Sequence, residues 1–300
     1  MQKDIKATDA SAQAGRGQKP ARRKGQWIGA AVGKFFTALG TVAPGATLRL
    51  LNKLLFTPSR PPRSDSAKAL LATAKVDRFT VEGSSICRYR WGEGSKRVLL
   101  VHGWGGDAAQ MTEFVEPLRA QGFEVIAVDL PAHGASAGKL SSVMHFQAVV
   151  MQLHKELGPF HGVVAHSLGA AALAYALSHG MTCQRAVFIG PMCSYDTVWA
   201  HSQQILQVSP GLISKTRAHA ESWLKIKFDE IEPVRLAPAM KAGLLVIHDR
   251  ADREAPIEES EKLVRVWPGA RLVATEKLGH TRILRDPEVA RQAAGFIAGA

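Results

Sequence analysis

The sequence has few cysteines and no recognisable metal-binding pattern. Its 300 residues include three cysteines, Cys87, Cys183 and Cys193, whose spacing matches neither a zinc site nor a paired disulfide framework. Free thiols of this kind are typical of a reducing compartment, which predicts a cytoplasmic protein. The zinc-binding pattern His-Glu-x-x-His is also missing. We therefore expect neither a metal nor a cofactor.

An apolar run long enough to be a clear membrane span is missing as well. The apolar stretch of residues 27–43 is interrupted by Lys34 and several glycines and ends at Pro44. A spanning helix needs about 20 consecutive apolar residues, so this stretch is of marginal length. Its mixture of apolar and basic residues favours an amphipathic helix. Two interpretations stay open: residues 16–56 contact the inner face of an anionic membrane, or they pack against the rest of the protein.

Acidic residues are scarce near the N-terminus. Residues 1–64 contain twelve Lys or Arg and two Asp, a net charge of +10, whereas residues 65–300 carry a net charge of +2. A nearly neutral body lacks the basic face that nucleic-acid binding requires, so we expect no nucleic-acid partner. The composition predicts a disordered basic tail over 1–25, a helical extension and Pro-rich linker over 26–66, and one domain over 67–300. The oligomeric state is left open.

Ser167 stands at the end of an apolar run and at the start of an Ala-rich helical pattern. The run Val-Val-Ala-His-Ser-Leu-Gly places small residues, Ala165 and Gly169, two positions before and after it. This is the pattern of a nucleophile elbow, a sharp strand-to-helix turn that exposes a serine hydroxyl. The first small residue is usually Gly, so Ala165 is a mild departure. The pattern alone is weak evidence, because short motifs occur often by chance.

A carboxylate and a histidine follow in the order that acyl transfer by such a serine requires. Asp252 comes just after the apolar strand pattern at residues 244–247, and His280 follows the next predicted strand, about 270–275. The side chains at the carboxyl ends of parallel strands gather at one edge of a sheet. Asp249 is an alternative acid that is less suitable than Asp252, because it falls too close to the strand end, and Glu254 is a weaker third candidate. The sequence therefore predicts Ser167, Asp252 and His280 as a catalytic triad.

A Gly-rich loop supplies the expected oxyanion hole. The predicted strand of residues 97–101 runs into His102, Gly103 and Trp104, followed by two further glycines. Acyl transfer needs two N–H donors aimed at the developing oxyanion, and we assign them to Trp104 and Leu168. The glycine spacing does not fit a dinucleotide-binding loop.

Together with the segment Asp129-Leu-Pro-Ala-His-Gly-Ala-Ser136, these motifs make the chain resemble the α/β-hydrolase superfamily over about residues 77–298. The resemblance implies an α/β fold with a mostly parallel eight-stranded sheet flanked by helices. It also implies Ser167 as nucleophile, Asp252 as acid and His280 as base.

About fifty residues, 191–241, separate two predicted strands, which is longer than a plain crossover helix needs. We expect a small helical lid here, because this is where the superfamily inserts a cap over the substrate. Candidate pocket residues are His102, Gly103, His166 and Met192.

These patterns predict a carboxylesterase-like serine hydrolase that cleaves a small ester or thioester through an acyl-enzyme on Ser167. Two alternatives remain: a lipid hydrolase recruited to a membrane by its basic N-terminal part, and a binding protein that keeps this fold without turnover.

Overall fold

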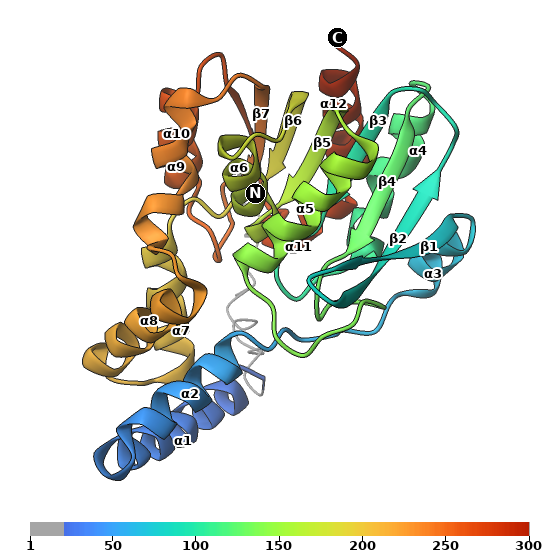
Figure 1. Cartoon of the computed structure of the whole chain (residues 1–300). Helices are drawn as coiled ribbons and strands as arrows, with labels where there is room; N and C mark the ends of the chain where they lie inside the picture. The colour runs from blue at the N-terminus through green and yellow to red at the C-terminus, as the bar shows by residue number, and fades with distance from the viewer. Residues whose placement is uncertain (1–20, 300) are drawn as a thin grey trace, which may run out of the picture.

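A computed structural model of the chain describes residues 21–299, arranged as one sheet between layers of helices (Figure 1). The sheet has eight strands in the order β1-β2-β4-β3-β5-β6-β7-β8. The antiparallel pairs are β1 with β2 and β2 with β4, and every other neighbouring pair is parallel. The strands are β1 (Lys75–Val81), β2 (Ser84–Trp91), β3 (Arg97–Val101), β4 (Glu124–Asp129), β5 (Phe160–His166), β6 (Cys183–Ile189), β7 (Gly243–Asp249) and β8 (Arg271–Thr275). The predicted mostly parallel eight-stranded α/β fold is confirmed.

The middle strands are mostly apolar and buried because helices cover both faces of the sheet. Alternate residues of a strand point to opposite faces, so Leu99 belongs to one core and Leu100 to the other, and both are fully buried. The flanking helices are α3 (Asp65–Ala72), η1 (Ala108–Phe114), α4 (Val115–Arg119), α5 (Val143–Leu157), α6 (Leu168–Ser178), α10 (Ile257–Val266), α11 (Gly279–Arg282), η4 (Ile283–Arg285) and α12 (Pro287–Ala298).

The segment expected to form a lid is helical in the structure. It consists of α7 (Tyr195–Leu206), α8 (Pro210–Leu224), η2 (Phe228–Ile231), α9 (Pro233–Leu236) and η3 (Ala237–Ala239). Trp199 and Phe228 are buried in it with ring centroids 5.6 Å apart, so these aromatic side chains serve packing.

The N-terminal extension forms a helical hairpin, α1 (Ala21–Val42) and α2 (Pro44–Leu55), that packs on this lid (Figure 1). Gly29 and Gly33 let α1 approach the end of α7, since a Cβ atom at either would lie within 2.4 Å of a backbone oxygen there. On α2, Phe56 at the C-terminal end stacks edge-on against Trp223 of α8. Of the stretch expected to be disordered, residues 1–20 lie outside the described residues and residues 21–25 begin α1.

Candidate active site

Ser167 occupies a sharp turn between β5 and α6. Its backbone has φ 49° and ψ −120°, a conformation that costs a residue with a side chain about 1–3 kcal/mol. Two hydrogen bonds hold it: Ser167 N–H donates to Ile189 O at 3.1 Å, and Met192 N–H donates to Ser167 O at 3.3 Å. Gly169 must be small, because a Cβ atom there would lie 2.4 Å from His102 O. The local structure is thus the elbow that the motif predicts.

His280 lies between Ser167 and Asp252. Its Nε2 is 3.0 Å from Ser167 Oγ, and its Nδ1 is 2.7 Å from Asp252 Oδ2. The three side chains come from the carboxyl ends of β5 and β7 and from α11, which begins just beyond β8. The order of hydroxyl, imidazole and carboxylate suits proton transfer from the serine to the histidine.

Asp252 and Asp249, which the sequence offers as alternative acids, have different hydrogen-bond partners in the structure. Asp252 has a side chain only 1% exposed, and its Oδ1 accepts the N–H groups of Glu254 and Ala255. Asp249 instead accepts hydrogen bonds from Ala251, Thr275 and Leu278, which tie β7 to the loop before α11. Asp252 is therefore the partner of His280, and Asp249 is a structural residue.

Glu254, the third candidate acid, is 59% exposed. Its carboxylate lies 3.9 Å from His280 Nε2, on the serine side of the ring. It therefore does not share the orienting position of Asp252.

The charges around His280 make it a stronger base than an isolated histidine. Burial alone would lower its pKa, but the hydrogen bond to Asp252 and the charge of that carboxylate outweigh burial and raise the pKa above the ordinary value. Burial would likewise raise the pKa of Asp252, yet hydrogen bonds from His248 and His280 bring it well below its usual range. Asp252 thus stays ionised while His280 gains and loses a proton.

His248 is a neighbour of Asp252 that sequence reasoning missed. It is fully buried on β7, with Nε2 3.0 Å from Ala255 O and 3.3 Å from Asp252 Oδ2. Its Nδ1 is 2.6 Å from the Ser260 hydroxyl, which can donate to it. The only signal in the sequence was a histidine four residues before the acid.

His166 supports the loop that carries His280. The two rings have centroids 4.7 Å apart, and His166 Nε2 is 3.0 Å from the backbone oxygen of His280. Burial and the neighbouring His280 lower the pKa of His166 to about 3, so it is neutral near pH 7. Of the expected pocket residues, His166 contacts His280 itself.

The other expected pocket residues differ in their placement. Gly103 lies directly against the elbow: a Cβ atom there would be 2.9 Å from Ser167 Cβ. Met192 bonds to Ser167 through its backbone, but its side chain is in the core cluster on one face of the sheet. His102 is fully buried with both ring nitrogens engaged, by Gly103 O and the Leu130 N–H. The ring of His102 is therefore enclosed between two loops, and its place in the substrate pocket stays a prediction.

One expected oxyanion donor, Leu168, follows Ser167 in the chain, and the other, Trp104, follows Gly103, which lies against Ser167. Leu168 is the first residue of α6, where a helix leaves its N–H groups without an intrahelical partner. Trp104 follows Gly103, and its half-exposed ring stands edge-on to His133, with centroids 5.3 Å apart. In residues 21–299 no cluster of three or more His, Cys, Asp or Glu side chains is arranged to hold a metal ion.

Comparison with known proteins agrees with this architecture. A family model described as the alpha/beta hydrolase fold matches residues 96–228. The dihydrolipoyllysine-residue acetyltransferase component of the acetoin cleaving system of Cupriavidus necator is 34% identical over 122 residues, 39% of this chain and 31% of that protein. The match spans between about a quarter and a third of the length of the curated relatives.

Solved structures of similar fold align over most of the chain. An esterase of Pyrococcus furiosus matches with a TM-score of 0.60 and 24% identity, covering 80% of this chain and 95% of the esterase. A bacterial membrane phospholipase A matches with a TM-score of 0.61 and 20% identity, covering 88% of this chain and 97% of its own. Together, the family model and these structures show that the chain has the alpha/beta hydrolase fold.

Proposed function

We propose that this protein is a serine hydrolase that cleaves a carboxylic ester or thioester through an acyl-enzyme on Ser167. One observation carries the proposal: the His280 ring stands within hydrogen-bond distance of both Ser167 Oγ and Asp252 Oδ2. A hydroxyl, an imidazole and a buried carboxylate in this order can perform acyl transfer without a cofactor. The esterase of similar fold supports the choice of an ester substrate.

In the first half of the reaction, His280 Nε2 takes the Ser167 proton as Oγ attacks the substrate carbonyl. The carbonyl oxygen becomes an oxyanion, which the N–H groups of Leu168 and Trp104 bind, each donor contributing about 3–4 kcal/mol. His280 then gives its proton to the leaving alkoxide or thiolate as the tetrahedral intermediate collapses. Asp252 keeps Nδ1 of His280 protonated throughout, so Nε2 always faces the serine.

In the second half, water replaces the serine as nucleophile. His280 takes a proton from the water, the oxyanion forms again in the same site, and Ser167 Oγ leaves with the proton that His280 returns. The products are the free acid and the regenerated serine, so no outside oxidant or reductant is involved.

Turnover of p-nitrophenyl esters and acyl thioesters of several chain lengths tests this proposal. We expect the purified wild type to hydrolyse at least one series, and Ser167→Ala to lose about 10⁶-fold in kcat. Ser178→Ala, an exposed serine at the end of the same helix, is the control and keeps full activity. Equal rates of hydrolysis by Ser167→Ala and by the wild type would contradict the proposal.

A membrane-bound lipid substrate is a second candidate, and the outer faces of α1 and α2 favour it. No helix in the part of the chain that the structure describes is long and apolar enough to cross a membrane. The hairpin nevertheless exposes four large apolar side chains at helical spacing: Phe35 (57% exposed), Val42 (80%), Leu50 (44%) and Leu54 (46%). Three exposed cations accompany them, Lys34, Arg49 and Lys53.

The charge of this hairpin fits an anionic lipid surface. Between Asp9 and Asp65 the chain has no acidic residue. A Lys or Arg at the surface of an anionic bilayer contributes about 1 kcal/mol to binding. The membrane phospholipase A of similar fold covers 88% of this chain, more than the hydrolase domain alone provides. We infer that the hairpin brings the active site to lipid esters at a bilayer.

A further inference from the structure

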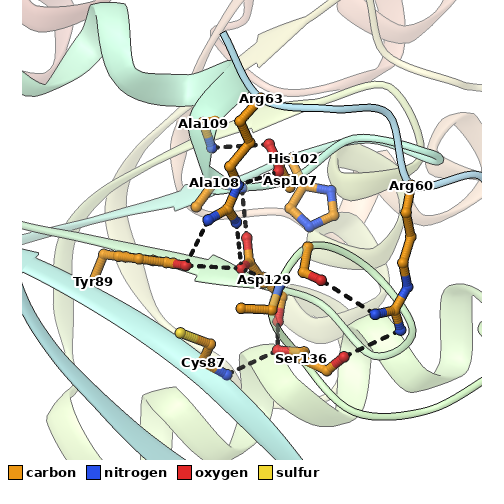
Figure 2. Close-up of polar contacts among 12 residues, drawn as sticks. Arg60, Arg63, Cys87, Tyr89, His102, Asp107, Ala108, Ala109, Asp129 and Ser136 are labelled. Atoms are coloured by element: carbon orange, nitrogen blue, oxygen red, sulfur yellow. Dashed lines mark hydrogen bonds and ion pairs between the residues drawn. The ribbon is translucent and has the colours of Figure 1, made fainter. Parts of the chain in front are cut away.

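The linker between α2 and α3 is bound to the domain by two arginines. The sequence suggested only a Pro-rich connection, yet Arg60 and Arg63 both point into the loops beside the sheet edge (Figure 2). We call residues 58–63 the strap. Its two arginines contact the loop after β3, residues 102–107, and the loop after β4, residues 130–138.

Arg60 donates hydrogen bonds to four backbone carbonyls of the loop after β4. Its guanidinium donates to Ala132 O at 2.9 Å, Gly134 O at 3.2 Å, Ser136 O at 3.2 Å and Gly138 O at 3.0 Å. Ala132, Gly134 and Gly138 all have positive φ, so the loop curls tightly and turns these oxygens toward one point. A cation at that point compensates the converging dipoles, and a guanidinium has enough donors to reach all four.

Arg63 joins the two loops through a pair of aspartates. Its Nε donates to Asp107 Oδ2 and its Nη2 to Asp129 Oδ2, both at 2.6 Å, while Nη1 donates to Tyr89 at 3.1 Å. Asp129 is fully buried and also accepts the N–H group of Ala108 on Oδ1 and that of Ala135 on Oδ2. A buried carboxylate is stabilised by a paired cation, and Arg63 supplies that cation to Asp129, which holds the loops together.

Two histidines complete the connection to the catalytic serine. His102 in the first loop accepts the Leu130 N–H from the second, and His133 in the second accepts the Gly105 N–H from the first. The first loop contains Gly103 and Trp104, and Gly103 lies against Ser167. Any shift of the strap arginines is therefore passed to the backbone that carries one expected oxyanion donor.

We propose that Arg60 and Arg63 are positioning residues that fix the Trp104 N–H for the oxyanion, so that the strap is part of the catalytic apparatus. This rests on the proposed serine-hydrolase function. The strap follows α2 in the chain after two residues, and α2 packs on the lid. The same short segment thus joins α2, which packs on the lid, to the loop after β3, residues 102–107.

The test compares kcat and KM for Arg60→Ala and Arg63→Ala with those for Arg78→Ala. Arg78 is exposed and donates to Ala135 O of the same loop, but it touches neither aspartate, so it is the matched control. We expect kcat to fall about 10²-fold in the strap variants with little change in KM, because a displaced donor weakens the transition state more than substrate binding. Arg78→Ala keeps its kcat.

Three further readouts separate positioning from loss of folding. The acid limb of the kcat/KM profile reports His280 and is expected to stay in place, since the strap does not touch it. Low concentrations of guanidinium ion should restore part of the kcat of Arg63→Ala. Arg63→Lys keeps the charge and guards against a misfolded alanine variant: it should fold and still turn over more slowly than the wild type.

Hydrogen exchange of the amides at residues 103–106 gives an answer that does not depend on activity. Faster exchange in the folded strap variants than in Arg78→Ala is the expected result. Unchanged exchange, or full kcat in folded Arg60→Ala and Arg63→Ala, overturns the strap proposal alone. A wild type that cleaves no ester contradicts the proposed function, while the exchange result still decides whether the strap orders the loop.

Discussion

Asp252 determines how well His280 can act as a base. Replacing it with Asn removes the charge that raises the pKa of His280, so this pKa falls. We expect kcat to drop about 10⁴-fold, because an amide favours the wrong imidazole tautomer. The acid limb of kcat/KM, which the raised pKa of His280 shifts to higher pH in the wild type, should move to lower pH in Asp252→Asn.

The pH profile is measured with one ester substrate across the acid range for both proteins. Asp249→Asn is the comparison, because Asp249 stabilises the neighbouring loop without touching His280. An acid limb that stays unchanged in Asp252→Asn would contradict the assignment of Asp252.

The site requires a glycine at position 103, because a larger residue would collide with the turn at Ser167. An added Cβ atom would lie 2.8 Å from His166 Nδ1 and 2.9 Å from Ser167 Cβ, at the strained turn between β5 and α6. Gly103→Ala should therefore displace the loop of residues 102–107, which contains Trp104, and reduce kcat by about 10²-fold. Gly211→Ala on α8 has nothing within 4 Å and serves as the control. A Gly103→Ala enzyme with normal kcat would show that the loop has more room than the structure gives it.

Among single residues, the sequence predicts those that can be recognised from their order along the chain. Ser167, Asp252 and His280 each follow a predicted strand, and the topology of a parallel sheet then brings them to one edge. His248 and the strap arginines could not be predicted in this way. Their roles depend on side-chain burial and on contacts between distant segments, such as Arg63 with Asp129, 66 residues apart.

At the scale of helices, α1 depends on two glycines for its contact with α7. A Cβ atom at Gly33 would lie 2.2 Å from Gln207 O, a backbone atom that cannot move freely. We expect Gly33→Ala to weaken hairpin packing by about 1–3 kcal/mol, even though Ala favours a helix by about 1 kcal/mol over Gly. Limited trypsin digestion at Arg49 and Lys53 measures how often the hairpin opens.

Gly45→Ala is the matched control for this experiment. Gly45 is also helical, on α2, and has nothing within 4 Å of its Cβ position, so alanine there should leave digestion unchanged or slower. Equal digestion of the two variants would contradict the close packing of α1 on α7.

The positions of the helices and strands could be predicted where the hydrophobic pattern of the sequence is strong. The strand expected at about 270–275 is β8, and the strand expected at 97–101 is β3. The helical extension was also foreseen, but its packing on the lid was not. That contact depends on matching surfaces of α1 and α7, about 170 residues apart, which no local pattern encodes.

At the scale of the whole molecule, the uneven charge predicts binding to anionic bilayers. The full chain should sediment with vesicles of phosphatidylglycerol and phosphatidylcholine, and less with pure phosphatidylcholine or at high salt. Leu50→Glu combined with Leu54→Glu should weaken binding at least tenfold, because it places two acids on the exposed face of α2.

Val76→Glu is the control for vesicle binding, since Val76 is 54% exposed on β1, away from the hairpin. Equal recovery of the wild type from anionic and neutral vesicles would contradict electrostatic binding. An equal loss of binding in Val76→Glu would contradict the assignment to the hairpin.

The central claim is that Ser167 is a nucleophile activated by His280. Labelling of the folded wild type with a fluorophosphonate, followed by peptide mapping, tests it most directly. We predict one stable adduct on Ser167 Oγ, its absence in Ser167→Ala, and slow formation in His280→Ala. A folded wild type that takes up no label, or carries it on another residue, would contradict the account.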